Sequence, residues 1–330
     1  MRNSAPAFAP ASVGNVAIGF DILGHTVEAI GDRVHVTRTA TPGVTIRAIT
    51  GVAVDLPLET ERNTAGRALQ SLALEQNLDF GIEMTIEKGI PLGSGLGGSA
   101  ASAVAAVVAG NALLAQPLPK IELLKYAMKG EQVASGSVHV DNIAPSLFGG
   151  LVLTVGVDHP RTKQIPVPPG IRAVLVHPHM FLSTKEARGI LSKTVEMSDL
   201  VWQCANLAGF ISACYTNDLD MIRDAFEDVI IERQRQTLIP GFKAVKAAAM
   251  AHGALGCSIS GAGPTVFAWC EEARAEADAI DRAIQDREGR LQSAKAAAKR
   301  CAISGLAFVG LSSTAVRAGL RQIGSPSLRQ

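Results

Sequence analysis

The sequence predicts an α+β fold, because its strand-like and helical stretches come in groups instead of alternating one by one along the chain. Its 330 residues are enough for two domains. Hydrophobic residues make up 47% and charged residues 18%, a balance typical of a folded chain with a large apolar core. Aromatic residues reach only 4%, so Ala, Val, Ile and Leu must fill most of that core.

Strands and one helix are expected up to about residue 88. Apolar and polar residues alternate over 33–39, and similar short runs cover 44–49 and 81–87, which predicts three strands. Between the second and the third, residues 63–78 have apolar side chains at helical spacing, which predicts a helix.

A glycine-rich segment, 89–98, follows the third strand and leads into two expected helices, 99–115 and 119–134. No charged residue occurs from Gly89 to Pro119, a stretch long enough to be mistaken for a membrane span. Its opening glycines and serines and its alanine-rich remainder favour a buried helix instead. We therefore expect no membrane partner.

Strand character returns at 151–157 and 172–177, and the proline-rich connection between them, 165–170, is either a domain boundary or a long hairpin loop. A helical region is expected over 184–251, and a hairpin follows with its strands at 254–260 and 265–270. One charged helix is expected after it, over 271–290.

Charge and cysteine usage limit the class of protein. The chain has 31 Lys and Arg against 30 Asp and Glu, so the strongly basic balance of a nucleic-acid-binding protein is absent. Beyond residue 286 eight basic residues accompany one acidic residue, which predicts a solvated basic tail. The five cysteines form no C-x-x-C pair, and residues 1–20 do not resemble a secretory signal. These features predict a cytoplasmic protein.

The glycine-rich segment is the clearest chemical signal. Gly93, Gly95 and Gly98 match G-x-G-x-x-G, but no second strand ending in an acidic residue follows, so a dinucleotide-binding unit is excluded. No G-K-[ST] follows either, which excludes a Walker P-loop. Backbone N–H groups of such a loop can approach an anion closely, and the helix that starts at Ser99 points its positive end there. The segment therefore predicts a phosphate-binding loop, with a packing turn as the alternative.

At this loop the chain resembles the GHMP kinases. Pro91–Ser102 is similar to the phosphate loop of that family, Ala9–Gly24 to its first motif and Ser258–Thr265 to its third, in the family's order and spacing. Asn15–Gly24 and His139–Gly150 resemble segments of the branch that acts on homoserine. The resemblance covers about residues 5–285.

The resemblance implies a two-lobed α+β fold, with an N-terminal lobe like a ribosomal-protein domain and a ferredoxin-like C-terminal lobe. We accordingly expect an N-terminal nucleotide-binding domain over 1–160 and a C-terminal domain over 161–285. Residues 286–330 depart from the family and are expected to form an atypical tail, disordered or non-native.

The resemblance also implies ATP and Mg²⁺. Ser99 and Glu131 are the implied metal ligands, although Glu131 by itself reads equally well as a surface residue. Asn63 is expected either to cap the helix that begins there or to reach the adenine, and the two roles are compatible. The residues expected to bind the nucleotide are Asn63, Pro91, Leu92, Gly93, Ser94, Gly95, Leu96, Gly97, Gly98, Ser99, Ala100, Ala101 and Ser102.

The implied substrate is L-homoserine, a zwitterion with a γ-hydroxyl. Asp21 is the anion for its ammonium group, whereas Arg188 and Arg235 can bind its carboxylate in the two-pronged geometry that Lys lacks. Asn15 and His139 complete the pocket by resemblance. Each arginine taken alone is more often a solvated surface residue, and Arg233 is the less favoured neighbour of Arg235.

A polar cluster lies inside an otherwise uncharged run from Gln132 to Val157. His139, Asp141 and Asn142 form it, and burying an aspartate without a partner costs several kcal/mol, so a role in catalysis is expected. Asp141 is either a general base for the hydroxyl or a residue that orients the loop and the substrate.

Alternative functions are another GHMP kinase, acting on mevalonate or a sugar, and a nucleotide-binding regulator without turnover. The first motif lacks a sugar-binding signature, and two arginines with one acid suit an amino acid better than mevalonate. An intact set of Ser99, Glu131 and Asp141 argues against a regulator. The family's habit predicts a homodimer.

Overall fold

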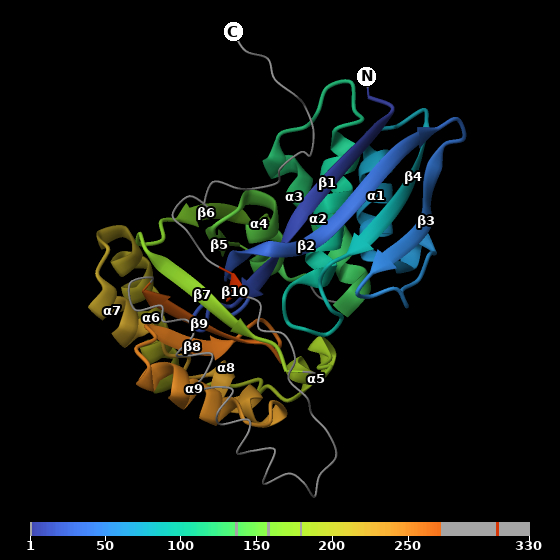
Figure 1. Cartoon of the computed structure of the whole chain (residues 1–330). Helices are drawn as coiled ribbons and strands as arrows, with labels where there is room; N and C mark the ends of the chain where they lie inside the picture. The colour runs from blue at the N-terminus through green and yellow to red at the C-terminus, as the bar shows by residue number, and fades with distance from the viewer. Residues whose placement is uncertain (1, 136–137, 157–158, 179, 272–307, 310–330) are drawn as a thin grey trace, which may run out of the picture.

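The computed structural model describes residues 2–135, 138–156, 159–178, 180–271 and 308–309, and two sheets organise this part of the chain (Figure 1). The first contains β3-β4-β2-β5-β6 in that order, with β1 also paired to β2, and the second contains β10-β7-β9-β8. The strands are β1 (Ser4–Gly14), β2 (Leu23–Thr39), β3 (Gly43–Gly51), β4 (Gly81–Lys88), β5 (Leu151–Val155), β6 (Arg161–Ile165), β7 (Ile171–Val176), β8 (Gly256–Ile259), β9 (Val266–Glu271) and β10 (Phe308–Val309). The α+β prediction is therefore confirmed.

Helices pack on the first sheet from one side (Figure 1). They are α1 (Thr64–Glu75), α2 (Gly98–Asn111), α3 (Lys120–Ser135) and α4 (Val140–Phe148). Helix α2 is apolar on every side and nearly all of its residues are buried, because it lies between β1 and β2 on one side and α1 and α3 on the other. The expected buried helix is confirmed, and among the described helices none is long and apolar enough to cross a membrane.

The second sheet is covered by a separate set of helices (Figure 1). The single helical region expected over 184–251 is divided into α5 (Thr184–Gly189), α6 (Met197–Thr216), α7 (Leu219–Ala225), α8 (Ile231–Arg235) and α9 (Phe242–Ala251). The expected hairpin is the antiparallel pair β8 and β9, in which Ile259 lies opposite Val266. The charged helix expected over 271–290 lies outside the described residues.

The chain passes from the first sheet to the second at the proline-rich connection. Strand β6 pairs with β5 in the first sheet, with Leu151 opposite Ile165, whereas β7 pairs with β9 in the second. The first sheet thus includes residues 161–165, which the expected division at residue 160 assigned to the C-terminal domain. The division itself stays a prediction, as does the assignment of 286–330, of which only 308–309 are described.

One aromatic cluster joins the two lobes. Trp269 on β9 donates from Nε1 to Nε2 of His25 on β2 at 3.1 Å, and Phe210, Phe226 and Phe267 surround the pair at ring separations of 5.2–6.0 Å. Burial lowers the pKa of His25 to about 4, so this histidine is neutral at ordinary pH and can accept that hydrogen bond. The two lobes therefore share a core, which fixes the cleft between them.

Candidate active site

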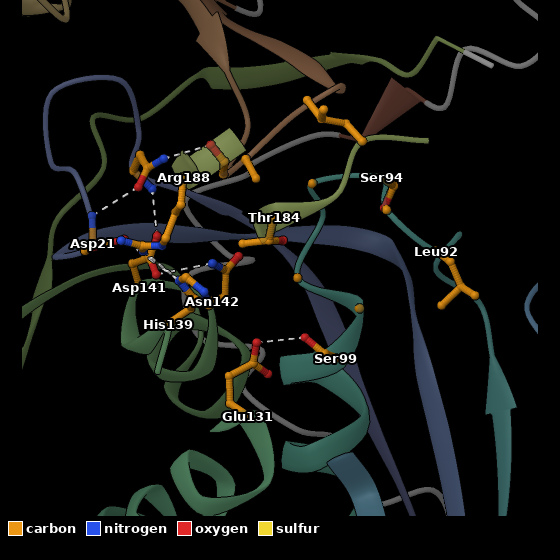
Figure 2. A pocket seen from close by; sticks show the side chains of 18 of the residues that line it. Asp21, Leu92, Ser94, Ser99, Glu131, His139, Asp141, Asn142, Thr184 and Arg188 are labelled. Atoms are coloured by element: carbon orange, nitrogen blue, oxygen red, sulfur yellow. Dashed lines mark hydrogen bonds and ion pairs between the residues drawn. The ribbon is translucent and has the colours of Figure 1, made fainter. Parts of the chain in front are cut away.

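A cleft between the lobes collects most of the predicted site residues (Figure 2). They come from the β1–β2 loop, the phosphate loop, the ends of α3 and α4, the segment that leads into α5, and the third motif. The lining residues are Asn15, Asp21, Pro91, Leu92, Gly93, Ser94, Gly95, Gly97, Gly98, Ser99, Glu131, His139, Asp141, Asn142, Leu182, Thr184, Arg188, Arg235, Gly261 and Ala262.

The backbone of the phosphate loop is left-handed at Gly93, Gly95 and Gly97, with φ of 61°, 77° and 65°. These values favour glycine over any residue with a Cβ. The N–H groups of these three glycines have no hydrogen-bond acceptor among the described residues. Left-handed glycines whose N–H groups are unpaired can form a concave anion-binding site.

Hydrogen bonds from other segments hold the carbonyl groups of the same loop. The oxygen of Gly93 accepts from Leu182 N at 3.3 Å, and that of Leu96 accepts from Ser12 N at 3.1 Å. Two residues of the third motif hold the carbonyls of Ser94 and Gly95. Thr265 Oγ1 donates to Ser94 O at 2.6 Å, and Ser260 Oγ donates to Gly95 O at 2.7 Å. The third motif therefore holds the loop in position through its carbonyl groups.

Glu131 faces the start of α2 from α3. Its Oε1 accepts from Ser99 Oγ at 2.8 Å, as Figure 2 shows, while its Oε2 is buried and has no partner among the described residues. The residue is 3% exposed, and burial raises the pKa of its carboxyl to about 7. Glu131 is thus a buried acid with one oxygen bound to Ser99 and the other without a partner in the described part of the chain.

Five residues expected to bind the nucleotide do not line this cleft. Leu96, Ala100 and Ala101 are buried in the core. Asn63 caps α1, since its Oδ1 accepts from Ala65 N and Gly66 N at 3.0 and 3.2 Å and its Nδ2 donates to Pro57 O. The capping alternative is the one observed, and contact of Asn63 with adenine stays a prediction. The fifth residue is Ser102.

Ser102 lies beneath the phosphate loop and its hydroxyl is engaged by other side chains, so its contact with the nucleotide stays a prediction. It donates to Asp32 Oδ2 at 2.6 Å and accepts from Lys88 Nζ at 2.8 Å, and Asp32 and Lys88 form a buried ion pair. Lys88 also donates to Gly98 O at 2.8 Å, which anchors the start of α2. The sequence analysis missed this pair, although Lys88 is the last charge before the long uncharged stretch.

The loop after β1 is strained. Asn15, Val16, Ala17 and Asp21 have φ between 43° and 69°, values that non-glycine residues rarely adopt and that cost most for the β-branched Val16. Contacts from both lobes hold this conformation: Asn15 N donates to Asp141 Oδ2 at 3.1 Å, and Asn15 Nδ2 donates to Gly261 O at 2.9 Å. Asn15 Oδ1 in turn accepts from Asp21 N, which fixes the position of Asp21.

Asp141 and Asn142 open α4 and lie at the bottom of the cleft. Asp141 is 1% exposed, and burial raises the pKa of its carboxyl to about 6, with a further contribution from the negative charge of Asp21. Both of its oxygens accept hydrogen bonds, one from Asn15 N and the other from Asn142 Nδ2 at 3.2 Å. Asn142 Oδ1 accepts from Ser12 Oγ at 3.0 Å.

The two arginines approach the cleft from different helices. Arg188 donates from Nη2 to Asp21 Oδ1 at 2.5 Å, and the same nitrogen lies 3.1 Å from Nδ1 of His139 (Figure 2). Arg235 is 2% exposed and donates from Nε to Ala187 O at 3.1 Å and from Nη1 to Gly261 O at 2.9 Å. Its pKa is lowered by burial to about 10, so it stays charged at neutral pH.

Opposite charges surround Asp21. Burial alone would raise the pKa of its carboxyl, but hydrogen bonds from His139 and Arg188 outweigh burial and lower it. The ring of Phe20 lies within 5.3 Å of the Arg188 guanidinium and 5.1 Å of the Arg235 guanidinium. The sequence analysis missed Phe20, whose role follows only from the position of the two arginines.

Comparisons with known proteins indicate one family for this chain. The model for the GHMP kinases N terminal domain matches residues 63–150, and the model for the GHMP kinases C terminal matches residues 210–286. The homoserine kinase of Xylella fastidiosa strain M12 is 50% identical over 283 residues, which cover 86% of this chain and 87% of that protein. The homoserine kinase of Xanthomonas campestris pv. campestris strain B100 is 51% identical over 281 residues, or 85% and 86% of the two chains.

Solved structures of other proteins share the fold of this chain. The homoserine kinase of Cytophaga hutchinsonii matches with a TM-score of 0.88 and 39% identity, and the match covers 98% of each chain. The L. major mevalonate kinase, solved in complex with R-mevalonate, shares the fold with a TM-score of 0.68 and 15% identity. On the similarity of these relatives over most of its length, the chain belongs to the GHMP kinase family.

Proposed function

We propose that this protein is a homoserine kinase, which transfers the γ-phosphoryl group of ATP to the side-chain hydroxyl of L-homoserine and forms O-phospho-L-homoserine for threonine biosynthesis. The observation that carries the proposal is a single cleft that combines an anion-binding loop with a separate cluster of one carboxylate and two guanidinium groups. A zwitterionic alcohol needs such a cluster beside the phosphates. The relatives named homoserine kinase support the same substrate.

Phosphoryl transfer requires positioning and neutralisation of charge more than covalent chemistry. The unpaired N–H groups of Gly93, Gly95 and Gly97 and the positive end of α2 would hold the phosphates of ATP. The Asp32–Lys88 pair would keep the start of α2 in place beneath them.

Magnesium fits the residues beside the loop. Mg²⁺ takes hard oxygen ligands, and Ser99 and Glu131 offer a hydroxyl oxygen together with a buried carboxylate oxygen that has no other partner in the described part of the chain. These two residues would hold the ion, which when bound neutralises charge on the phosphates. The neighbouring cluster of Asp21, His139 and Asp141 suits it less, because Arg188 already lies against Asp21.

The substrate would lie between the loop and the two arginines. Asp21 would bind its ammonium group, and Arg188 and Arg235 its carboxylate, with Asn15 and His139 at the sides. Asp141 and Asn142 would orient its hydroxyl toward the phosphate. Both oxygens of Asp141 already accept hydrogen bonds, so we favour orientation over proton abstraction for this residue.

Release of ADP tests the proposed function. The purified protein with ATP and Mg²⁺ should release ADP rapidly with L-homoserine and at background rate with mevalonate or galactose. Turnover with mevalonate or galactose in place of homoserine would assign the protein to another kinase of the family. Tight ATP binding with no transfer to any of these alcohols would identify a nucleotide-binding regulator.

Arg188→Lys should raise the homoserine KM by about 10- to 100-fold, or about 1.4 to 2.8 kcal/mol, and leave the ATP KM nearly unchanged. Lysine keeps the charge but loses the planar two-pronged contact with a carboxylate. Arg233→Lys is the matched control, because Arg233 lies outside the cleft against Asp199 and Trp202. An equal loss of ATP affinity would show that Arg188 serves the phosphates or the fold.

Asp141→Asn should lower kcat by less than about tenfold. The amide oxygen can still accept the hydrogen bond from Asn15 N, and a loose transition state gains little from a base. Steady-state rates over pH 5 to 9 check this expectation. A loss of about 10²- to 10⁴-fold in kcat, with the low-pH limb of the profile removed, would identify Asp141 as a general base.

We further propose that the protein acts in the cytoplasm as a homodimer. The thiols of Cys204, Cys214, Cys257 and Cys270 are free, as expected in a reducing compartment. Sedimentation of the purified chain tests the dimer.

A further inference from the structure

The ion pair between Asp21 and Arg188 joins two groups that have separate tasks in the proposed function. Asp21 is the anion for the ammonium group and Arg188 a cation for the carboxylate, yet here they bind each other at 2.5 Å. Their side chains are 34% and 30% exposed, so the pair faces the cleft and a ligand can reach it.

A zwitterion can replace this pair without leaving a charge unpaired. Its ammonium group takes the place of the guanidinium at Asp21, and its carboxylate takes the place of the aspartate at Arg188. A ligand with one of the two charges separates the pair but compensates only one partner. The other partner then loses its nearest counter-charge in a partly buried site, which costs binding energy beyond the lost contact.

The neighbouring groups do not remove this requirement. Arg235 is 2% exposed and already donates from Nε and Nη1 to the carbonyls of Ala187 and Gly261, so it is fixed in place and does not replace Arg188 at Asp21. Arg188 Nε is buried without a partner among the described residues. A carboxylate that reached Arg188 would therefore find an unused donor there.

We propose that the Asp21–Arg188 ion pair is a selectivity device for zwitterions, which admits an amino acid bearing a hydroxyl and rejects alcohols that carry only an amine or only a carboxylate. The proposal rests on the proposed function. On this proposal, part of the selectivity comes from the strength of each contact with the substrate. The rest comes from the exchange of one ion pair within the protein for two ion pairs with the substrate.

Two reciprocal variants test the exchange with two half-substrates. 4-Hydroxybutanoate is homoserine without its amine, and 3-amino-1-propanol is homoserine without its carboxylate. In Asp21→Asn, a carboxylate that binds Arg188 no longer separates it from a charged aspartate. The kcat/KM for 4-hydroxybutanoate should therefore rise about tenfold above that of the unmodified protein. In Arg188→Gln, kcat/KM for 3-amino-1-propanol should rise by a similar factor. Both variants should lose at least about 100-fold with homoserine.

Asp199→Asn is the matched control, because Asp199 pairs with Arg233 at 3.7 Å outside the cleft and its removal should leave all three substrates unchanged. A measurement on the unmodified protein does not depend on how variants fold. Ammonium chloride, compared with potassium chloride, should lower the inhibition constant of 4-hydroxybutanoate against homoserine severalfold, since the ammonium ion can occupy Asp21.

The outcomes separate this inference from the proposed function. If the unmodified protein does not phosphorylate homoserine, the proposed function fails. If it does, but each half-substrate is used equally or less well by its variant and ammonium has no effect, the exchange is overturned and Asp21 and Arg188 bind the substrate independently. A gain for both half-substrates in both variants would indicate a loosened cleft and would also overturn it.

Discussion

Replacing Glu131 by Gln should lower kcat with homoserine by about 10²- to 10³-fold and make the protein more stable. The fall in rate is expected because the amide removes the one charged ligand proposed for Mg²⁺ while keeping the size of the side chain and an acceptor for Ser99 Oγ. Glu122→Gln is the control, since Glu122 lies exposed in the first turn of the same helix.

The gain in stability follows from the raised pKa of Glu131. The folded carboxyl has a pKa of about 7 against a usual 4.5, so the folded state holds more protons between these values. The contribution of this group to stability is largest below about pH 4.5 and is lost as pH rises through 7. The Gln variant lacks this loss and should be more stable at pH 8 by roughly 3 kcal/mol.

Denaturant unfolding at pH 5 and pH 8 measures the effect. The difference in unfolding free energy between Gln and Glu should be larger at pH 8 than at pH 5. A variant that is less stable at pH 8, or that keeps its rate, would contradict the assignment of Glu131 as a buried acid reserved for the metal.

Replacing Gly95 by Val should weaken ATP binding by at least about 100-fold, or roughly 2.8 kcal/mol. Gly95 has φ of 77°, and a Cβ there would lie 2.5 Å from Ser260 O and 2.7 Å from Gly263 O. The side chain would push the phosphate loop away from the third motif that fixes its N–H groups. Titration calorimetry with a non-hydrolysable ATP analogue measures the change.

Gly170→Val is the control that separates the effect of the close contacts at position 95 from the effect of backbone strain. Gly170 has the same φ of 77°, but a Cβ there meets no described atom within 4 Å. The two variants should share a destabilisation of about 1–2 kcal/mol, and only Gly95→Val should lose ATP affinity. Equal ATP affinity in both variants would show that the third motif does not hold the loop.

Local patterns predicted much of the fold. Helix α1 has an apolar stripe at helical spacing, and the uncharged stretch after the glycines predicted α2 as a buried helix. Strand β1 was missed because Pro6 and Pro10 argue against a strand, yet β1 pairs only with β2 and an edge strand tolerates proline. Helix α4 was missed because it is short and contains Pro145.

The site was predicted in its residues and less well in its contacts. Spacing and resemblance identified Arg188 and Asp21, but their ion pair joins residues 167 positions apart and depends on how the lobes pack. The contacts of Gly261, whose carbonyl accepts from both Asn15 and Arg235, likewise depend on how the lobes pack and could not be predicted from local sequence. The left-handed backbone at Asn15, Val16, Ala17 and Asp21 has no local signal, because contacts with α4 and the third motif hold this loop.

Phosphorus-31 NMR of the reaction products tests the central claim most directly. Incubation of the protein with ATP, Mg²⁺ and L-homoserine should give ADP and one new phosphomonoester signal, split into a triplet by the two protons of the γ-carbon. That splitting would place the phosphoryl group on the hydroxyl, where the cleft directs it. An acyl phosphate signal, or release of inorganic phosphate with no ester formed, would contradict the account.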